Sequence, residues 1–367
     1  MADSKSKGAL AGVRVIDLTS VVLGPYATQM LGDMGADIIK VESPDGDTTR
    51  YTGPCESRDM ASLFLGVNRN KRSIVLDLKL AEARDVLLRL VDTADVFVHN
   101  IRPQKLDKLG LGSEALLKRN PRLVYAGIHG WREDGPYSGR PAYDDIIQGL
   151  CGVAALMDKL TGQPRYAPTI LADKTCGLVA AQSILAALYH REKTGRGQFV
   201  EIPMFETMVS FVMVEHLFGR TFVPGKADPG YTRVLASWRR PYKTADGYMN
   251  VAASGTQMWR RVCDAIARPE LFEHPDYATA EARAKNRAPL NALLNEAFAK
   301  KPTDEWVAIL NKAGVPCGPI YRMDQVFADA QAKHIGAAAE VAHPRLGNLR
   351  LINQPVKLSD RKSTRLN

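Results

Sequence analysis

The chain has 367 residues, 45% of them hydrophobic and 24% charged, a composition typical of a globular protein large enough for more than one domain. Its formal net charge of +9 indicates an anionic partner, although solvated surface charge explains the surplus equally well. Because the basic residues form no long block, they argue against nucleic acid and favour a small polyanionic ligand. No apolar run of about 18 residues predicts a membrane span, and the polar start lacks a signal core, so a cytoplasmic protein is expected.

The first half of the chain predicts strands that alternate with helices. Apolar, β-branched runs bounded by turn residues predict strands, and apolar residues at helical spacing predict the helices between them. The expected strands are 13–18, 37–42, 73–78, 96–99, 123–128 and 199–202, and the expected helices are 26–34, 81–91, 144–157 and one that follows Asp173. Such units build a parallel sheet, so we expect an α/β fold with a Rossmann-like, doubly wound, mostly parallel sheet.

The second half predicts a smaller α+β domain. The chain turns Gly/Pro-rich and irregular from about 220 to 238, and Asp246-Gly247 then centres a predicted hairpin over 241–252. Helices are expected at 259–267, 290–300 and 304–313, and a last strand at 349–357. We therefore predict a large domain over 1–220, a linker with the smaller domain over 221–318, and a return segment over 319–367 that completes the large domain.

The sequence carries none of the common cofactor or metal motifs. Its five cysteines and seven histidines are dispersed without a Cys-x-x-Cys pair or metal-ligand spacing, so no metal is expected and the cysteines are interpreted as core residues in a reducing compartment. A nicotinamide site would need Gly-x-Gly-x-x-Gly after the first strand. Only Gly24, Gly32 and Gly35 occur there, at the wrong spacing.

One carboxylate, Asp173, stands where an apolar segment gives way to a predicted helix. A helix N-terminus stabilises anions, so this position favours the ionised carboxylate that a covalent nucleophile requires. The same physics allows a plainer interpretation, in which Asp173 is an N-cap that contributes about 1 kcal/mol. The residues alone favour the N-cap.

Several ordered motifs, however, resemble those of the class III CoA-transferase family, also called CaiB/BaiF. This family includes formyl-CoA transferases and is related to α-methylacyl-CoA racemase. The matching segments, spread from about residue 9 to about 358, are 15–19, 24–25, 31–42, 70–74, 100–103, 120–123, 135–137 and 193–198. Asp173 falls at the position of the family's catalytic aspartate. With this resemblance, the interpretation of Asp173 as a covalent nucleophile is favoured over the N-cap interpretation.

The resemblance implies a substrate, a mechanism and an assembly. Coenzyme A enters as the acyl-CoA substrate and not as a bound cofactor, and it moves between carboxylic acids through aspartyl anhydride and aspartyl-CoA thioester intermediates, without a metal. The family forms interlocked homodimers. By family position, the residues expected to contact CoA are Val22, Leu23, Leu76, Lys79, Asn100, Ile101, Arg102, Lys108, Tyr143 and Asp144. Three of them, Lys79, Arg102 and Lys108, are expected to bind the phosphates, although each could be a solvated surface cation.

Departures from the family pattern limit the prediction. Tyr143 stands where the racemases carry a histidine, and a phenol with a pKa near 10 is a poor proton acceptor at neutral pH, so transfer is favoured over racemisation. Val22 replaces a glutamine of formyl-CoA transferases, which predicts an acyl group less polar than oxalate: a short dicarboxylate, a branched acid or an aromatic acid. A non-catalytic CoA-binding protein remains a further alternative. The tail from about 360 departs from the family and is interpreted as truncated or foreign.

Overall fold

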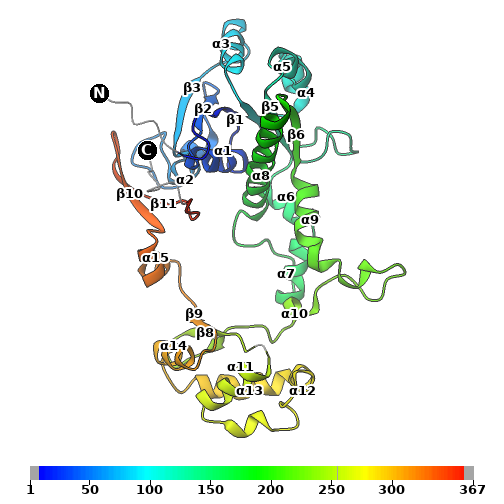
Figure 1. Ribbon diagram of the computed structural model, residues 1–367, viewed down its shortest axis with the longest axis vertical. Helices are drawn as coiled ribbons and strands as arrows, with labels where there is room; N and C mark the ends of the chain where they lie inside the picture. The colour runs from blue at the N-terminus through cyan, green and yellow to red at the C-terminus, as the bar shows by residue number, and fades with distance from the viewer. Residues whose placement is uncertain (1–7, 254, 359–367) are drawn as a thin grey trace. The chain divides into compact units, whose positions relative to one another are not determined.

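The computed structural model describes residues 8–253 and 255–358, and the expected foreign tail from about 360 lies outside them (Figure 1). The chain forms two compact units. One runs up to Gly230 and resumes at Ala330, and the other is Tyr231–Asp329. Strand β9 (Cys317–Pro319), at the end of the range predicted for the smaller domain, pairs with a strand of the second unit.

A six-stranded sheet forms the centre of the larger unit. Its strands lie in the order β3-β2-β1-β4-β5-β6, and every neighbouring pair is parallel. The strands are β1 (Arg14–Leu18), β2 (Asp37–Glu42), β3 (Lys71–Val75), β4 (Val96–His99), β5 (Val124–His129) and β6 (Gln198–Pro203). The prediction of an α/β fold with a parallel sheet is confirmed. The order reverses between β1 and β4, the position at which open α/β sheets bind ligands.

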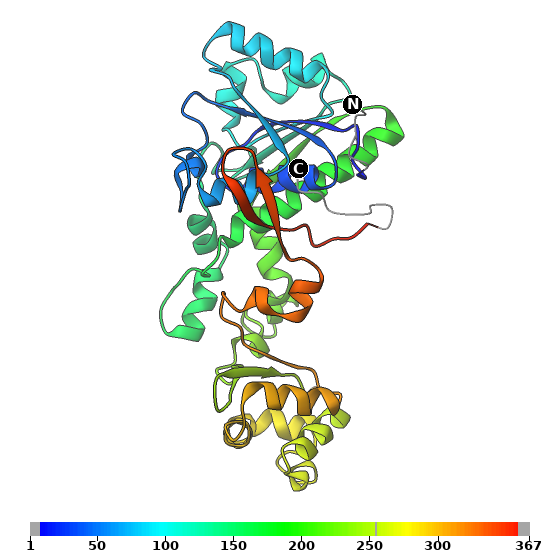
Figure 2. The same ribbon diagram turned by 90° about the vertical axis from the view of Figure 1, so that its left-hand side faces the viewer.

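Helices cover both faces of this sheet, which explains why β4 and β5 are buried along their whole length. One face carries α3 (Ala81–Asp92), α4 (Pro103–Lys108) and α5 (Ser113–Arg119), and the other carries α1 (Leu23–Asp33) and α8 (Leu171–Thr194), as Figures 1 and 2 show. Each face has its own apolar core cluster. The remaining helices of this unit are α2 (Ser62–Asn68), α6 (Asp144–Leu150), α7 (Val153–Thr161), α9 (Met204–His216) and α15 (Ala330–His334).

Helix α8 has 24 residues and ends at Thr194, and its C-cap residue Gly195 adopts the left-handed conformation with a φ of 74°. Its length and a mean hydropathy of 1.3 satisfy the criterion for a membrane span, which the sequence analysis had not expected. Core helices of globular proteins meet the same criterion, and half of the apolar window, 50%, is buried inside the fold. Ala172, Cys176 and Ala180 of α8 belong to the core cluster beneath the sheet.

The structure differs from the predicted elements at several places, and three of them bear on the fold of the larger unit. The helix expected over 144–157 is two helices, because Gly152 turns the chain with a φ of 95° between α6 and α7. Helix α1 begins at Leu23, before the predicted start at residue 26. The final strand, predicted over 349–357, is β11 (Gly347–Ile352), and it pairs with β10 (Ala338–His343), which the sequence analysis missed. Figure 2 shows this hairpin in orange and red.

The smaller unit combines a short antiparallel sheet with helices. The predicted hairpin at Asp246-Gly247 is present as β7 (Tyr242–Lys243) and β8 (Tyr248–Val251), and β9 adds the third strand. Trp259, Phe298 and Trp306 centre the core of this unit. Its helices are α10 (Thr232–Leu235), α11 (Thr256–Ala265), α12 (Ala280–Lys285), α13 (Arg287–Phe298) and α14 (Thr303–Lys312).

Candidate active site

Asp173 lies in the first turn of α8 and is 9% exposed. The helix begins at Leu171 with Ile170 as its N-cap residue, and the side chain of Ile170 makes no capping hydrogen bond. The N-cap interpretation of Asp173 is therefore wrong: the helix starts two residues earlier, and the carboxylate belongs to its first turn. A buried carboxylate without a capping role is available for chemistry.

A second carboxylate lies beside Asp173. The backbone N–H of Asp173 donates to Oδ1 of Asp144 at 3.0 Å, so Asp144 provides the negative charge that the start of α8 favours. Burial, together with the Asp144 carboxylate, raises the pKa of Asp173 from 3.8 to about 7. Burial and this like charge therefore act against the helix dipole, which favours the ionised carboxylate.

Gly177 brings Asp173 close to the loop that joins β1 to α1. It lies four residues after Asp173, on the same face of α8. A Cβ atom at Gly177 would lie 2.9 Å from the carbonyl oxygen of Leu23 and 3.1 Å from Cδ1 of Tyr26. Only glycine allows α8 to approach the start of α1 this closely. Gly177, one turn after Asp173, therefore packs against the first turn of α1, next to Val22 and Leu23, which are both predicted to contact CoA and are buried.

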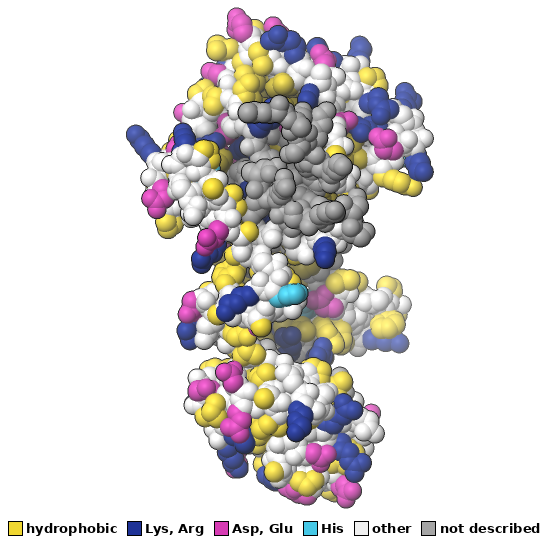
Figure 3. All heavy atoms as spheres, turned by 60° about the vertical axis from the view of Figure 1, so that its left-hand side comes forward, with side chains coloured by type: hydrophobic (Ala, Val, Ile, Leu, Met, Phe, Trp, Pro, Cys, Tyr) yellow, Lys and Arg dark blue, Asp and Glu magenta, His cyan; other side chains and the backbone are white. Residues whose placement is uncertain are grey.

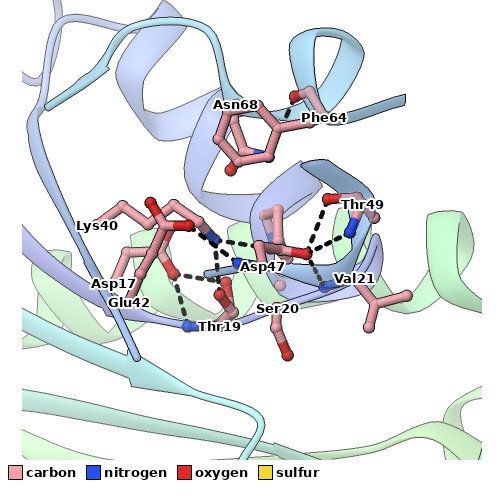
Figure 4. Close-up of polar contacts among 12 residues, drawn as sticks. Asp17, Thr19, Ser20, Val21, Lys40, Glu42, Asp47, Thr49, Phe64 and Asn68 are labelled. Carbon is pink, nitrogen blue, oxygen red and sulfur yellow. Dashed lines mark hydrogen bonds and ion pairs between the residues drawn. The ribbon is translucent and has the colours of Figure 1, made fainter. Parts of the chain in front are cut away.

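The β1–α1 loop is held in a strained conformation just before Val22. Val21 has a φ of 70°, which is rare for a β-branched residue. Its N–H donates to Oδ1 of Asp47 at 3.2 Å (Figure 4). The same oxygen of Asp47 accepts from the backbone N–H and the hydroxyl of Thr49, at 3.0 and 2.8 Å. Backbone strain persists only where surrounding contacts enforce it, and Asp47 supplies such a contact.

Lys40 also stabilises the β1–α1 loop, through one hydrogen bond and one ion pair. Its Nζ donates to the carbonyl oxygen of Thr19 at 2.7 Å and forms an ion pair with Oδ2 of Asp47 at 3.0 Å. Both charged side chains are 1% exposed, so removal of either would leave an unpaired charge in the interior. Figure 4 shows these bonds meeting under the loop.

A further buried ion pair joins Asp17 of β1 to Lys71 of β3, at 3.1 Å. Burial acts to raise the pKa of Asp17, but Lys71 and Lys40 outweigh it and lower this pKa to about 2. Burial lowers the pKa of Lys71 to about 8, although Asp17 opposes the change. The Asp17–Lys71 ion pair and the neighbouring Lys40 therefore stabilise the residues that support the β1–α1 loop.

Asn100 connects the loop after β4 to the loop after β1. Its side-chain amide donates to the carbonyl oxygen of Ser20 at 2.9 Å and accepts from the N–H of Ser20 at 3.1 Å. Next to it, burial and His129 lower the pKa of His99 to about 3, so that ring is neutral and its Nδ1–H donates to the carbonyl oxygen of Ile101 at 3.0 Å. The two loops that flank the switch point of the sheet are thus joined through residues predicted for the CoA site.

The three predicted phosphate ligands, Lys79, Arg102 and Lys108, are exposed at the ends of β3 and β4 and of α4. Among the described residues, no ion pair involves them, whereas Lys40 and Lys71 are paired in the interior. On the face drawn in Figure 3, basic and acidic side chains are interspersed, so the net charge is not gathered there in one patch.

The predicted CoA contacts fall into two groups on opposite faces of the sheet. Leu23 packs in the cluster that contains α8, and Asp144 bonds to Asp173. Leu76 and Ile101 instead pack against the cluster under α3 and α4. Asn100 and Ser20 connect the groups at the switch point, while the side chain of Tyr143 is 68% exposed. Leu76 follows β3 and does not end it, because that strand stops at Val75.

A cavity of about 590 Å³ lies elsewhere in the larger unit, between the edge of the sheet at β2 and β3 and the β10–β11 hairpin. It contains none of the predicted CoA contacts. Two cations in its wall, Arg50 and Arg69, are already bound to Glu42 and Asp33. Within residues 8–253 and 255–358, no group of three or more His, Cys, Asp or Glu side chains could hold a metal ion.

A family model described as CoA-transferase family III matches residues 10–367. The chain belongs to this family. It is 35% identical over 363 residues to mouse succinyl-CoA:glutarate CoA-transferase, covering 97% of this chain and 82% of the relative. It is also 35% identical to acetyl-CoA:oxalate CoA-transferase of Acetobacter aceti, covering 97% of this chain and 90% of the relative. The crystal structure of a CaiB/BaiF family protein from Brucella suis superposes with a TM-score of 0.83 at 34% identity, covering 96% of this chain and 93% of that one.

These relatives establish the type of reaction. Curated relatives of this chain carry the names of CoA-transferases, and the family match extends over nearly all of the sequence. The protein is therefore an enzyme of the CoA-transferase type, whose substrates are CoA thioesters. The resemblance stated from the motifs is confirmed.

Sequence reasoning missed several residues that organise the site. Gly177 could have been found from its spacing, because it follows Asp173 by one helical turn. Gln148 follows Asp144 by one turn in the same way. No local signal connects Asp47 with Lys40 or with Val21, since the contacts between them depend on the folded sheet.

Proposed function

We propose that this enzyme transfers coenzyme A between carboxylic acids with Asp173 as the covalent nucleophile. The observation that carries the proposal is the position of Asp173: a buried carboxylate in the first turn of α8, held by Gly177 against the β1–α1 loop. That loop lies at the switch point of the sheet, where α/β proteins bind their ligands. The strand order supports the Rossmann-like character expected from the sequence.

The reaction proceeds through four attacks at carbonyl carbon. The Asp173 carboxylate attacks the acyl-CoA thioester, the C–S bond breaks, and CoA thiolate leaves behind an acyl anhydride on Asp173. The thiolate then attacks the aspartyl carbonyl, which releases the first acid and forms an aspartyl-CoA thioester. The acceptor carboxylate attacks this thioester, giving a second anhydride and free thiolate. The thiolate finally attacks the acceptor carbonyl, which produces the new acyl-CoA and restores Asp173.

The environment of Asp173 suits the first attack. A carboxylate whose pKa is raised to about 7 is more basic than an ordinary aspartate, and nucleophilicity increases with basicity. Its basicity is therefore closer than that of an ordinary aspartate to the basicity of the departing thiolate, whose conjugate thiol has a pKa near 8.5. Burial also limits the access of water, which would hydrolyse the anhydride.

The two groups of predicted contacts support one orientation of CoA. The phosphates bind Lys79, Arg102 and Lys108 on the face of α3 and α4, where these cations have no described ion-pair partner. The thioester end crosses the switch point beside Asn100 and reaches Asp173 past Val22. The apolar Val22 and Leu23 contact the acyl chain. In this orientation Tyr143 and Asp144 border the acyl group.

The names of the relatives suggest the acids. Succinate, glutarate and oxalate occur in them, and we propose a short dicarboxylate as one of the two acids exchanged. The working form is an interlocked homodimer located in the cytoplasm, with acyl-CoA and a free carboxylate as its small-molecule partners.

Replacement of the nucleophile tests this proposal. Asp173→Ala abolishes transfer from succinyl-CoA to glutarate, while CoA still binds in isothermal titration calorimetry, because the phosphate and pantetheine contacts lie elsewhere. Asp145→Ala, which removes an exposed carboxylate of α6, keeps activity within twofold of the original protein and serves as control. Full transfer by Asp173→Ala would refute the covalent mechanism. Exchange of the α-proton of a 2-methylacyl-CoA without an acceptor acid would instead identify a racemase.

A further inference from the structure

The buried amide of Gln148 joins the start of α6 to the segment that leads into α8. The side chain lies in the last turn of α6 and is 1% exposed. Its Nε2 donates to Oδ2 of Asp144 at 2.5 Å and to the carbonyl oxygen of Thr169 at 3.4 Å. Its Oε1 accepts from the N–H of Ala167 at 2.9 Å. One side chain therefore contacts both Asp144 and the residues just before Asp173.

The contacts of Gln148 complete those of the Asp144 carboxylate. Oδ1 of Asp144 accepts from the N–H of Asp173, and Oδ2 accepts from Gln148. With both oxygens engaged, the carboxylate cannot rotate without breaking a partly buried hydrogen bond. Such a loss is unfavourable by about 1 to 3 kcal/mol. The position of the Asp144 charge next to Asp173 is therefore fixed by Gln148.

The chemistry of the amide explains why glutamine occupies this position. A donor must face Asp144 and Thr169, which present only acceptor atoms, and an acceptor must face the N–H of Ala167. A glutamine side chain offers both. A glutamate of nearly the same shape would direct a carboxylate oxygen at Asp144. A methionine would make none of the three hydrogen bonds.

We propose that Gln148 is a positioning residue for CoA transfer, which holds Asp144 and the 167–169 segment so that the Asp173 carboxylate points toward the thioester. The inference rests on the proposed function of Asp173. Gln148 is buried behind Asp144 and acts through it. Reaction rates depend steeply on the placement of a nucleophile, and a displacement of about 1 Å can reduce a rate on the order of 100-fold.

The proposal predicts a separation of kinetic constants. Gln148→Met keeps the size and the apolar stem of the side chain, and it lowers kcat for succinyl-CoA to glutarate transfer at least about tenfold while the KM for succinyl-CoA stays within about twofold. Gln148→Glu lowers kcat at least as much, although it is closer to glutamine in shape. The matched control is Gln29→Met in α1, which removes a buried amide whose Oε1 has no hydrogen-bond partner among the described residues. Its kcat stays within twofold of the original protein.

Each rate is normalised to the number of functional sites, measured as Asp173 hydroxamate after exhaustive reaction with succinyl-CoA and hydroxylamine, so partial unfolding of a variant does not affect the result. A positioning role leaves this number unchanged and slows its formation. The inference is overturned if Gln148→Glu matches the original protein, if the loss appears in KM, or if kcat falls only in proportion to the number of sites. If the unsubstituted enzyme forms no hydroxamate, the proposed function itself fails, and that outcome is distinct from the others.

Discussion

The raised pKa of Asp173 predicts that its ionised carboxylate destabilises the protein at neutral pH. An aspartate titrates near 3.8 in the unfolded chain and at about 7 in the fold, so between these values the folded state binds more protons than the unfolded state. Stability from this group is therefore present at low pH and is lost as the pH rises toward 7. At about 1.36 kcal/mol for each pKa unit, the full effect at pH 8 is on the order of 4 kcal/mol.

Asp173→Asn removes the charge and keeps the shape of the side chain. We expect its free energy of unfolding to match that of the original protein near pH 4 and to exceed it by about 2 to 4 kcal/mol at pH 8, although transfer activity is lost. Urea denaturation at one protein concentration, over a series of pH values, measures this difference. The reasoning is refuted if the two curves stay parallel or if Asp173→Asn is less stable at pH 8. Asp145→Asn, at an exposed carboxylate, should show no such pH dependence.

Three further substitutions test the packing around the β1–α1 loop. Gly177→Ala places a Cβ 2.9 Å from the Leu23 carbonyl oxygen, and we expect a loss of about 1 to 3 kcal/mol in denaturation together with a lower kcat, since α8 and α1 must separate. Val21→Gly relieves a φ of 70°, so thermal unfolding should shift upward by the equivalent of about 1 kcal/mol while the KM for acyl-CoA rises. Lys40→Met leaves Asp47 buried without its ion pair, and urea titration should show a loss of about 3 to 5 kcal/mol.

Controls make these three results specific. Gly66→Ala, in α2, meets no atom within 4 Å, so it should stabilise the protein by about 0.5 to 1 kcal/mol and leave kcat unchanged. Equal effects of Gly66→Ala and Gly177→Ala would contradict the close approach of α8 to α1. A less stable Val21→Gly variant would show that the loop carries no strain. A loss below 1 kcal/mol for Lys40→Met would contradict the burial of its ion pair.

Local patterns predicted the bounds of two strands of the sheet correctly. The strands expected at 37–42 and 96–99 have those bounds in the structure, because β-branched and aromatic residues between turns leave little alternative. Strand β10 is rich in alanine and was missed, since it depends on pairing with β11. The single helix predicted over 144–157 includes Gly152, whose positive φ instead separates α6 from α7.

The candidate site was predictable only in part for a similar reason. The motifs identified Asp173, but its protonation depends on Asp144, 29 residues away, and on burial that no local pattern encodes. The loop contacts of Asp47 and Asn100 join strands distant in the sequence. The sequence therefore predicts candidate residues for the site. Their hydrogen bonds and the charges that surround them became apparent only in the folded structure.

The most direct test of the account is mass spectrometry of the Asp173 peptide after incubation with succinyl-CoA and hydroxylamine. Hydroxylamine captures both the anhydride and the aspartyl-CoA thioester. The account predicts a hydroxamate at Asp173 that forms only when acyl-CoA is present and that is absent from the peptide carrying Asp144 and Asp145. If transfer to glutarate proceeds while Asp173 stays unmodified, the claim that Asp173 is the covalent nucleophile is contradicted.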